Sequence, residues 1–376
     1  MFSNKTTEKV KAILSSKRLN EKLKFIKEIY KMSKLDDLYR NIKLEFAGGY
    51  LYITAMNPMC CVKTHMEVLE HDLQFCVLVD AESFISVIGR YSVDLILEFL
   101  PNNNLTIKHD SGYVNTKWFP FGKLPFPSIY EQSGESVSYK CSDFIPFLKK
   151  SFMFTKEDEF MINLSMTYIS IDDEYINVFS TDRFAIYVHR EKNGNKIKSS
   201  DISINSVSAS ILYGMAAKSN GEVRVSSDDR ITYLSFDDTL IYNVNPEHKM
   251  PNFRNVMNAY KPDIKAVVNK DILKDVISKC AIDDKLTSTI YLGKEKSGIK
   301  SSDPSKGLDL VEYFINEFME GQNISFDIRL KRIKDAISCF GSKSITIEVS
   351  SESKFLRVSD PDGREKEFVL LSTYKN

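Results

Sequence analysis

Residues 205–245, NSVSASILYGMAAKSNGEVRVSSDDRITYLSFDDTLIYNVN, combine a helix-forming run with three short strands. The run 205–219 is predicted to be a helix, and the strands that follow it alternate apolar and polar residues. Asn, Asp, Gly and Ser residues, which favour tight turns, separate these strands. A helix followed by antiparallel hairpins predicts an α+β unit in which the helix packs on one face of a sheet.

This pattern of one helix and three strands occurs three times along the chain. The predicted helices span 80–92, 205–219 and 328–340. A strand that leads into an earlier helix also recurs, with these helices predicted at 17–32, 142–153 and 270–281. Repetition of this kind indicates tandem copies of one structural unit. We therefore predict three tandem α+β domains, each with two helices packed on antiparallel sheets, covering residues 1–133, 134–261 and 262–376.

The composition is that of a globular protein. The 376 residues are 43% hydrophobic and 27% charged, and the sequence contains no run of about 18 apolar residues that could span a membrane. The first residues, MFSNKTTEKVKAIL, lack the apolar segment and the small-residue cleavage site of a signal peptide. The six cysteines form no Cys-x-x-Cys pair, which indicates buried free thiols. We expect a soluble cytoplasmic protein.

The charges balance in number but not in position. Lys and Arg total 51, as do Asp and Glu, so the net charge is zero. A protein that binds nucleic acid through its overall charge is basic, so contact with DNA would require the basic residues to lie on one surface. Lysines do concentrate on the predicted helices, whereas acidic residues concentrate in the turns between strands, as in IDDEY, SSDDR and DPDG.

The sequence carries no motif for catalysis or cofactor binding. The five histidines are scattered without metal-binding spacing, and there is no phosphate-binding loop, GxGxxG or GxSxG motif. Pairs of aspartates could hold Mg²⁺ as in a nuclease, but they fall where hairpins are predicted to turn, and Asp favours turns. We therefore expect no enzyme, no cofactor and no bound metal. A nuclease that cleaves DNA with aspartate and Mg²⁺ remains an alternative.

One strand-like stretch contains a polar triplet that needs an explanation. Residues 178–190, VFSTDRFAIYVHR, are predicted as a strand, with Thr181, Asp182 and Arg183 in its middle. Aspartate has low strand propensity, and a charged pair inside an apolar run requires partners. Together with Phe184 and Ala185, the triplet resembles the Thr-Asp-Gly-His-Arg-Leu-Ala motif of the β sliding clamp of bacterial DNA polymerase III, without the Gly-His.

Two further segments carry the same resemblance. HKMPNFRNVM (248–257) is similar to the clamp family's Phe-Pro-Asp-Tyr-Arg-Arg-Val segment, and LPFPSIYE, at the end of the first repeat, is similar to its Leu-Pro-x-x-x-Phe-Pro. The resemblance covers the whole chain, because the family also has three repeats. It implies a homodimeric ring of six domains that encircles double-stranded DNA and tethers the replicative polymerase, as a processivity factor in DNA replication. The contact with DNA would be independent of base sequence, and the clamp loader and repair proteins would bind through a short peptide motif.

The resemblance also assigns residues to three surfaces. Helix lysines would face the DNA: Lys24, Lys27, Lys31, Lys149, Lys150, Lys218, Lys274, Lys331 and Lys334. The first domain of one copy would meet the third domain of the other through Val114, Thr116, Trp118 and Ile282. Partner peptides would bind a cleft formed by Leu164, Thr181, Arg183, Phe184, Pro251, Val256, Leu330, Val369, Leu370, Leu371, Ser372 and Thr373.

The sequence departs from the family's pattern at this cleft. Besides the missing Gly-His, Leu330 stands where the family often has an aromatic residue, and Ser372-Thr373 replaces a common Pro-Met. These differences affect the expected peptide preference rather than the fold. The main alternative, ahead of the nuclease, is therefore a clamp-like paralogue from a phage, a plasmid or a second gene copy, acting as a regulatory protein or a peptide-binding decoy.

Overall fold

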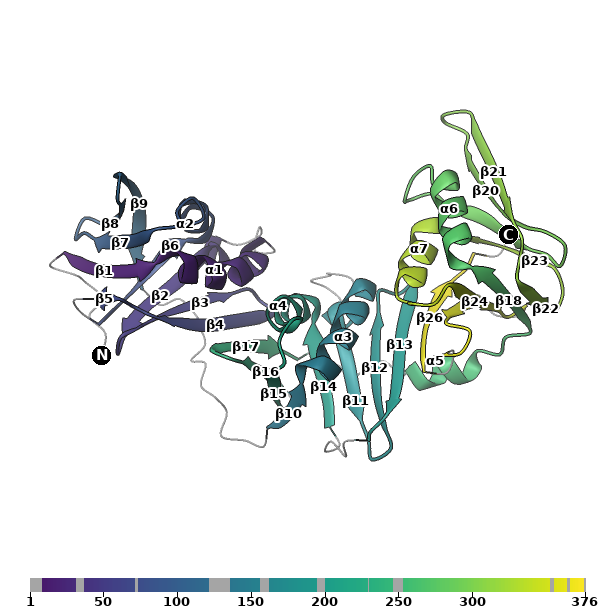
Figure 1. Cartoon of the computed structure of the whole chain (residues 1–376), viewed down its shortest axis with the longest axis horizontal. Coiled ribbons are helices and arrows are strands. Elements are labelled where there is room, and N and C mark those ends of the chain that lie inside the picture. The colour runs from purple at the N-terminus through teal and green to yellow at the C-terminus, as the bar shows by residue number, and fades with distance from the viewer. Residues whose placement is uncertain are drawn as a thin grey trace. The chain divides into compact units, whose positions relative to one another are not determined.

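The computed structural model describes residues 9–31, 37–71, 74–121, 136–155, 162–194, 200–228, 230–245, 253–351, 355–363 and 366–374. These residues belong to two compact units, each described by itself. Figure 1 labels their helices and strands. The first unit lies within Met1–Pro146 and Val207–Glu247, and the second lies within Phe147–Ser206 and His248–Asn376. Across the described ranges, no helix is long and apolar enough to cross a membrane.

The first unit is built on one antiparallel sheet. Its strands are β1 (Val10–Ser15), β2 (Asn41–Ala47), β3 (Tyr50–Met56), β4 (Cys60–Glu67), β5 (Glu70–His71), β6 (Phe75–Asp80), β7 (Asp94–Phe99), β8 (Asn104–His109), β9 (Gly112–Pro120), β10 (Val137–Lys140), β15 (Glu222–Ser227), β16 (Ile231–Phe236) and β17 (Thr239–Val244). They are hydrogen-bonded in the order β10-β15-β16-β17-β4-β3-β2-β6-β9-β8-β7-β1-β5. In strands such as β2, alternate residues enter the core, namely Ile42, Leu44 and Phe46.

The helices of the first unit are α1 (Ser16–Lys31), α2 (Ala81–Ile88), most of α4 (Ser206–Ala216) and the start of α3 (Cys141–Ser151). Helix α1 packs against α2 and against strands β3 and β4. It buries Leu19, Leu23 and Ile26, whose spacing places them on one side of the helix. Lys24 and Lys27 are exposed, so α1 is amphipathic, as the sequence indicates.

The second unit contains two antiparallel sheets. One has the order β14-β11-β12-β13-β26-β25-β24-β18-β22, and the other has the order β21-β20-β19-β23. The strands of the larger sheet are β11 (Met166–Ile171), β12 (Tyr175–Thr181), β13 (Ala185–Lys192), β14 (Ser200–Asn205), β18 (Ile264–Asn269), β22 (Phe318–Glu320), β24 (Ser344–Val349), β25 (Phe355–Ser359) and β26 (Glu367–Ser372). The smaller sheet consists of β19 (Ser288–Leu292), β20 (Ser297–Asp303), β21 (Leu308–Phe314) and β23 (Ile324–Ile328).

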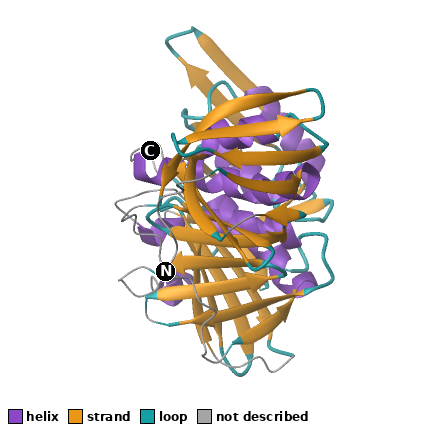
Figure 2. Ribbon diagram, turned by 90° about the vertical axis from the view of Figure 1, so that its left-hand side faces the viewer, coloured by secondary structure: helices purple, strands orange, loops and turns teal. Residues whose placement is uncertain are grey.

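The remaining helices complete the second unit. They are the end of α3, α5 (Phe253–Ala259), α6 (Lys270–Cys280) and α7 (Leu330–Ser338), with the short 3₁₀ helices η2 (Phe152–Phe154) and η3 (Ile162–Ser165); a further 3₁₀ turn, η1 (Asp37–Arg40), belongs to the first unit. Figure 2 shows helices lying in layers against the strands. Helix α6 packs on β20 and β21, and α7 packs on β25 and β26. The chain is therefore α+β, as the sequence predicts.

The six predicted helices are all present, but each repeat has a strand that the sequence pattern did not single out. In all three repeats a further strand immediately precedes the second helix, namely β6, β14 and β23. Strand β6, FCVLVD, is buried from Phe75 to Val79. A strand that is buried on both faces lacks the alternation of apolar and polar residues by which strands are recognised.

Hydrogen-bonded strand pairs join consecutive repeats. The last strand of the second repeat, β17, pairs with β4, the third strand after the first helix of the first repeat. In the same way β26, the last strand of the third repeat, pairs with β13, the third strand after α3. The two compact units consequently cut through the middle repeat, and the three domain boundaries given above stay a prediction.

Candidate partner-binding cleft

The polar triplet forms a tight turn and does not lie inside a strand. Strand β12 ends at Thr181 and β13 begins at Ala185, so the prediction of one strand over 178–190 is wrong at its centre. Asp182 Oδ1 accepts hydrogen bonds from the backbone N–H groups of Phe184 (3.0 Å) and Ala185 (2.9 Å). Thr181 Oγ1 donates to the carbonyl of Ala185 at 2.7 Å. The polar side chains therefore satisfy the backbone of the turn, as Asx turns do.

The charged partner of Asp182 comes from α7. Asp182 is 7% exposed, and its Oδ2 pairs with Nη1 of Arg332, in the first turn of α7. Its neighbour Arg183 is exposed and has a φ of +80°, a left-handed conformation that costs energy for a residue other than glycine. Among the described residues, Arg183 forms no ion pair. The ion pair of Asp182 thus ties the turn between β12 and β13 to the start of the last helix.

The C-terminal strand, predicted to form one wall of the cleft, lies beside this turn. Strand β26 pairs with β13, so that Leu370 is opposite Ile186 and Leu371 is opposite Ala185. The backbone N–H of Ser372 donates to the carbonyl of Phe184 at 2.8 Å. Val369, Leu370 and Leu371 are at most 1% exposed, Thr373 is 6% exposed and Ser372 is half-buried. The strand is therefore already packed in the free chain, and only its end is open to a ligand.

Two short helices place the other predicted cleft residues. Leu164 is half-buried in η3, which packs on β12. Val256 is half-buried in α5, which is held on the sheet by Phe253; the ring of Phe253 stacks on that of Phe179 with a centroid distance of 4.9 Å. Leu330 begins α7 and is 4% exposed, whereas Pro251 lies outside the described residues. Ring contacts and packing thus place Leu164, Val256 and Leu330 on elements that lie against β12 or β26.

An exposed phenylalanine lies among arginines at the edge of this cleft. Phe184 is 39% exposed, and the guanidinium carbons of Arg329 and Arg332 lie 5.8 and 5.3 Å from its ring centroid. These distances fall within the range of cation–π interactions. Arg329, Arg332 and Asp182 are not among the residues predicted from the sequence to form the cleft. The signal available was the segment RLKRIK (329–334), which contains four basic residues and no acidic one at the start of a helix.

A buried ionic cluster supports the other end of β26. Glu367 accepts hydrogen bonds from Lys150 Nζ at 2.7 Å and from the Tyr187 hydroxyl at 2.6 Å. His189 Nδ1 lies 3.8 Å from Oε1 of Glu367. Burial alone would raise the pKa of Glu367, but the nearby imidazole of His189 and the hydrogen bonds from Lys150 and Tyr187 lower that pKa to about 2. The carboxylate is therefore ionised at neutral pH and joins α3, β13 and β26.

The lysines predicted to face DNA differ in how they are held. Lys150 is engaged with Glu367, and Lys331 Nζ pairs with Asp335 at 2.9 Å. Lys24, Lys27, Lys149, Lys218 and Lys334 are exposed, and Lys274 is half-buried. The side chain of Lys31 lies outside the described set. The exposed members lie on helices except Lys218, which follows the end of α4.

The residues predicted for the dimer contact lie on β9 and after α6. Val114, Thr116 and Ile282 are half-buried. Trp118 is 3% exposed, and its Nε1 donates to the carbonyl of Leu100 at 3.0 Å. This indole is part of the core of the first unit, so its ring is not available on the surface of a single chain.

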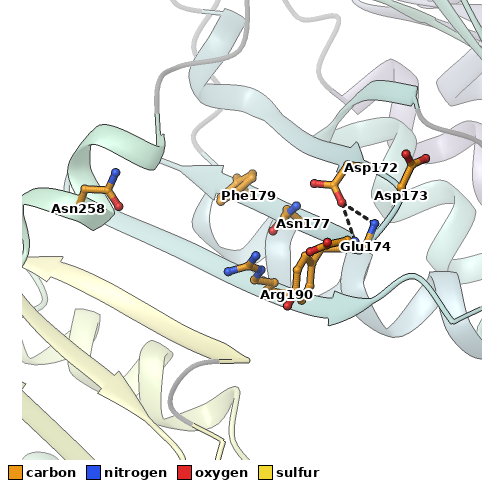
Figure 3. A pocket seen from close by; sticks show the side chains of 8 residues that line it. Asp172, Asp173, Glu174, Asn177, Phe179, Arg190 and Asn258 are labelled. Atoms are coloured by element: carbon orange, nitrogen blue, oxygen red, sulfur yellow. Dashed lines mark hydrogen bonds between the residues drawn. The ribbon is translucent and has the colours of Figure 1, made fainter.

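A separate hollow of about 560 Å³ lies on the second unit, beside the hairpin that joins β11 to β12. It is lined by Asp172, Asp173, Glu174, Tyr175, Asn177, Phe179, Arg190 and Asn258 (Figure 3). Asp172 Oδ1 accepts the backbone N–H groups of Glu174 (2.9 Å) and Tyr175 (2.6 Å). The guanidinium of Arg190 lies 3.7 Å from the centroid of the Tyr175 ring. Asp172 therefore acts as a turn former, as the sequence predicts for aspartates at hairpin tips.

Asp228 has the same role in the first unit, where its carboxylate accepts the backbone N–H groups of Arg230 and Ile231, both at 2.8 Å. Within the described ranges there is no group of three or more His, Cys, Asp or Glu side chains positioned to hold a metal ion.

The fold of the chain is that of bacterial DNA polymerase III beta subunits. The beta subunit of Thermotoga maritima matches with a TM-score of 0.86 at 16% sequence identity, over 98% of this chain and 100% of that chain. The sliding clamp of Bacillus subtilis matches with a TM-score of 0.84 at 12% identity, over 98% and 99%. The Helicobacter pylori beta clamp bound to a DNA ligase peptide matches with a TM-score of 0.79 at 14% identity, over 97% and 100%. No family model and no curated protein matches the sequence.

Proposed function

We propose that the chain is a DNA sliding clamp, of which two copies form a ring around duplex DNA and tether a polymerase for processive synthesis. The observation that carries this proposal is a strand pairing between repeats that occurs twice within the chain, whereas the corresponding third pairing has no partner strand within one copy. The last strand of the second repeat pairs with the third strand after the first helix of the first repeat, and the last strand of the third repeat pairs with the third strand after the first helix of the second. By the same rule, β9 of the first repeat requires β21 of a third repeat, which a second copy would supply.

Both strands have an edge that can accept this partner. Strand β9 pairs with β8 from Gly112 to Lys117, whereas its other edge pairs with β6 only at Trp118–Pro120. Strand β21 is the terminal strand of its sheet and pairs with β20. Exposed apolar residues flank both edges: Tyr113 on β9, and Val311 and Tyr313 on β21, are 65%, 45% and 56% exposed. A free edge with exposed apolar side chains is a surface for strand addition.

The distribution of lysines supports a weak contact with DNA that does not depend on base sequence. Phosphate attraction needs only a diffuse positive surface, and base contacts are unnecessary for it. Exposed Lys24 and Lys27 on α1, Lys218 after α4 and Lys334 on α7 would form part of such a surface inside a ring. Replication takes place where the DNA is, so we infer that the protein acts in the cytoplasm.

The cleft supports the tethering role. The Helicobacter pylori clamp binds a DNA ligase peptide, and we infer that short peptides of a polymerase, a clamp loader and repair proteins bind this chain between Phe184, Val256 and the end of β26. An apolar hollow with a few polar groups that fix orientation suits such a peptide.

The test combines mass in solution with retention on DNA. Sedimentation should give a dimer, twice the chain mass of 43.1 kDa, and the loaded protein should remain on circular duplex DNA but slide off linear duplex DNA. A monomer at micromolar concentration, or equal retention on both DNA forms, would contradict the ring. Cleavage of the DNA in Mg²⁺ would favour the nuclease alternative instead.

A further inference from the structure

Several basic side chains lie at the edge of the predicted cleft, and only some of them have a carboxylate partner among the described residues. Arg183 belongs to the turn between β12 and β13, and Arg329, Lys331 and Arg332 lie at the start of α7. Of these four cations, Arg332 pairs with Asp182 and Lys331 pairs with Asp335. A third nearby carboxylate, Asp327, accepts a hydrogen bond from Thr289 at 2.6 Å. Among the described residues, Arg183 and Arg329 have no carboxylate partner, and Nε of Arg329 is buried without a hydrogen bond.

The first repeat builds the same turn without these charges. Asn57, between β3 and β4, accepts the backbone N–H groups of Met59 and Cys60, both at 2.8 Å. The backbone N–H of Val244, just where β17 ends, donates to the carbonyl of Met59 at 2.9 Å, as that of Ser372 donates to Phe184. A neutral asparagine therefore suffices for the turn and for its link to the next repeat. The equivalent turn of the third repeat has an aspartate, Asp303, but its cation is Lys306 of the same turn. The pairing of Asp182 with an arginine of a helix in the next repeat has no counterpart in the other two turns.

The helix that follows shows the same difference. Asp80 caps α2 by accepting the N–H of Ser83, and Asn205 precedes α4. In the third repeat this position is Arg329, whose side chain forms no capping hydrogen bond, and the first turn of α7 has no acidic residue. Aspartate and asparagine are among the best N-cap residues, and cations are unfavourable at the positive end of a helix. Folding alone therefore disfavours an arginine here, and the side chain remains available for another contact.

We propose that the arginine rim, defined as Arg329 and Arg332 beside the exposed ring of Phe184 together with Arg183, which precedes Phe184 in the turn, binds a carboxylate of the partner peptide. The inference rests on the proposed function, in which a peptide occupies this cleft. An apolar side chain of the peptide packs on Phe184, and a carboxylate next to it accepts hydrogen bonds from the guanidinium groups of Arg183 and Arg329. Guanidinium groups suit a carboxylate because two parallel N–H groups can bind its two oxygens. The carboxylate belongs either to an acidic residue or to the free C-terminus of the partner.

The test uses four short peptides with the same Gln, Leu and Phe anchors. One pair carries Asp or Asn directly after the Phe, with an amidated C-terminus. The other pair ends at the Phe with either a free carboxylate or an amide. Binding to the full-length protein is measured by fluorescence anisotropy at low salt and at high salt. At least one peptide that carries a carboxylate should bind roughly 5- to 20-fold more tightly than its neutral partner at low salt, allowing for solvent screening of the rim. The pair that shows the difference identifies the source of the carboxylate.

The variants separate the arginine rim from general charge. Arg183→Gln combined with Arg329→Gln should remove the preference while the neutral peptides bind as before. Arg332 is left intact because it holds Asp182. The matched control is Arg224→Gln, which removes an exposed arginine of β15 in the first unit, and it should keep the preference. Thermal melting confirms that each variant is folded.

The outcomes distinguish this inference from the proposed function. Equal binding of the carboxylate and neutral peptides to the unaltered protein would overturn the arginine rim and leave the peptide cleft standing. A preference that falls equally in Arg224→Gln would also overturn it, because overall charge would then be the cause. Failure of every peptide to bind would overturn both the rim and the cleft, whereas ring formation would still be judged by mass and by retention on DNA.

Discussion

Glu367→Gln should destabilise the second unit, because Glu367 is the ionised centre of a cluster that joins three elements. Its side chain is 15% exposed and accepts hydrogen bonds from Lys150 and Tyr187. The pKa of this carboxyl is about 2 in the folded chain against an ordinary 4.5. At 1.36 kcal/mol per pKa unit, this difference corresponds to about 3 kcal/mol of stabilisation at neutral pH. The amide cannot replace the charge, so Lys150 would be left half-buried without a counter-ion.

The pH dependence has a defined sign. A carboxyl with a lowered pKa contributes its full stability above the ordinary value near 4.5, and this contribution is lost as the pH falls towards 2. His189 acts in the opposite sense. Burial lowers its pKa, but Glu191 and Glu367 together raise it above 6.5. Its contribution is complete below pH 6.5 and is lost as the pH rises through the raised value. The difference between wild type and Glu367→Gln should therefore be largest near pH 5–6 and should shrink in acid.

The assay is hydrogen exchange in urea, followed on peptides from β13 and β26, because it reports the stability of these strands separately from the first unit. The control is Glu295→Gln, which neutralises an exposed carboxylate elsewhere in the second unit. Exchange protection in Glu367→Gln equal to that of wild type at pH 6, or an equal loss of protection for both proteins between pH 5 and 2.5, would refute the reasoning.

Three further predictions concern the turn, the edge strands and the helix lysines. Asp182→Ala should lower the free energy of unfolding of the second unit by about 2–4 kcal/mol. Asp182→Asn should lower it by less, because Asn57 holds the equivalent turn of the first repeat. Urea unfolding measures both variants, and equal effects would contradict the role of Asp182 in the turn. Val311→Lys should weaken dimer formation roughly tenfold, since a lysine on an edge strand opposes strand addition; an unchanged dimer constant in sedimentation would place the interface elsewhere. Neutralising Lys24 and Lys27 together should reduce the salt dependence of retention on circular DNA by about 0.9 in log–log slope for each phosphate that these lysines neutralise in the wild type. An unchanged slope would show that α1 does not face DNA.

The repeat could be predicted from the sequence because its signals are local. Each hairpin is marked by turn residues, and each helix by an apolar stripe such as Leu19, Leu23 and Ile26. The fully buried strand β6 gave no alternation and was missed for that reason. The pairing of strands between repeats could not be predicted either, because β26 and β13 are far apart in the sequence. This pairing depends on which strand edges remain free once each repeat has folded.

The residues predicted for the candidate site lie on neighbouring elements, whereas the charge pairs beside them could not be predicted from the sequence. Thr181, Phe184 and Leu370 were selected through a family resemblance, and the structure brings their elements together through the pairing of β13 with β26. The partner of Asp182 lies 150 residues away on α7. From the sequence alone, the adjacent Arg183 would be the expected ion-pair partner of Asp182. In the structure Arg183 has a left-handed backbone conformation, and Asp182 pairs with Arg332 of α7 instead. Long-range charge pairs of this kind become visible only once the fold is known.

The two free edges also differ in charge, and this difference bears on how copies assemble. Strand β9 carries Lys117 and no acidic residue, whereas β21 carries Asp309 and Glu312 and no basic one. Two β21 strands placed side by side would bring like charges together, which opposes pairing, while β9 against β21 brings opposite charges together. Charge therefore favours a head-to-tail contact over a symmetric one. Copies joined head to tail form a closed ring when repeating the rotation from one copy to the next leads back to the first copy. Otherwise they continue into an open filament. A discrete dimer mass, with neither monomer nor higher species, would thus establish closure as well as stoichiometry, and closure is the property on which retention on circular DNA depends.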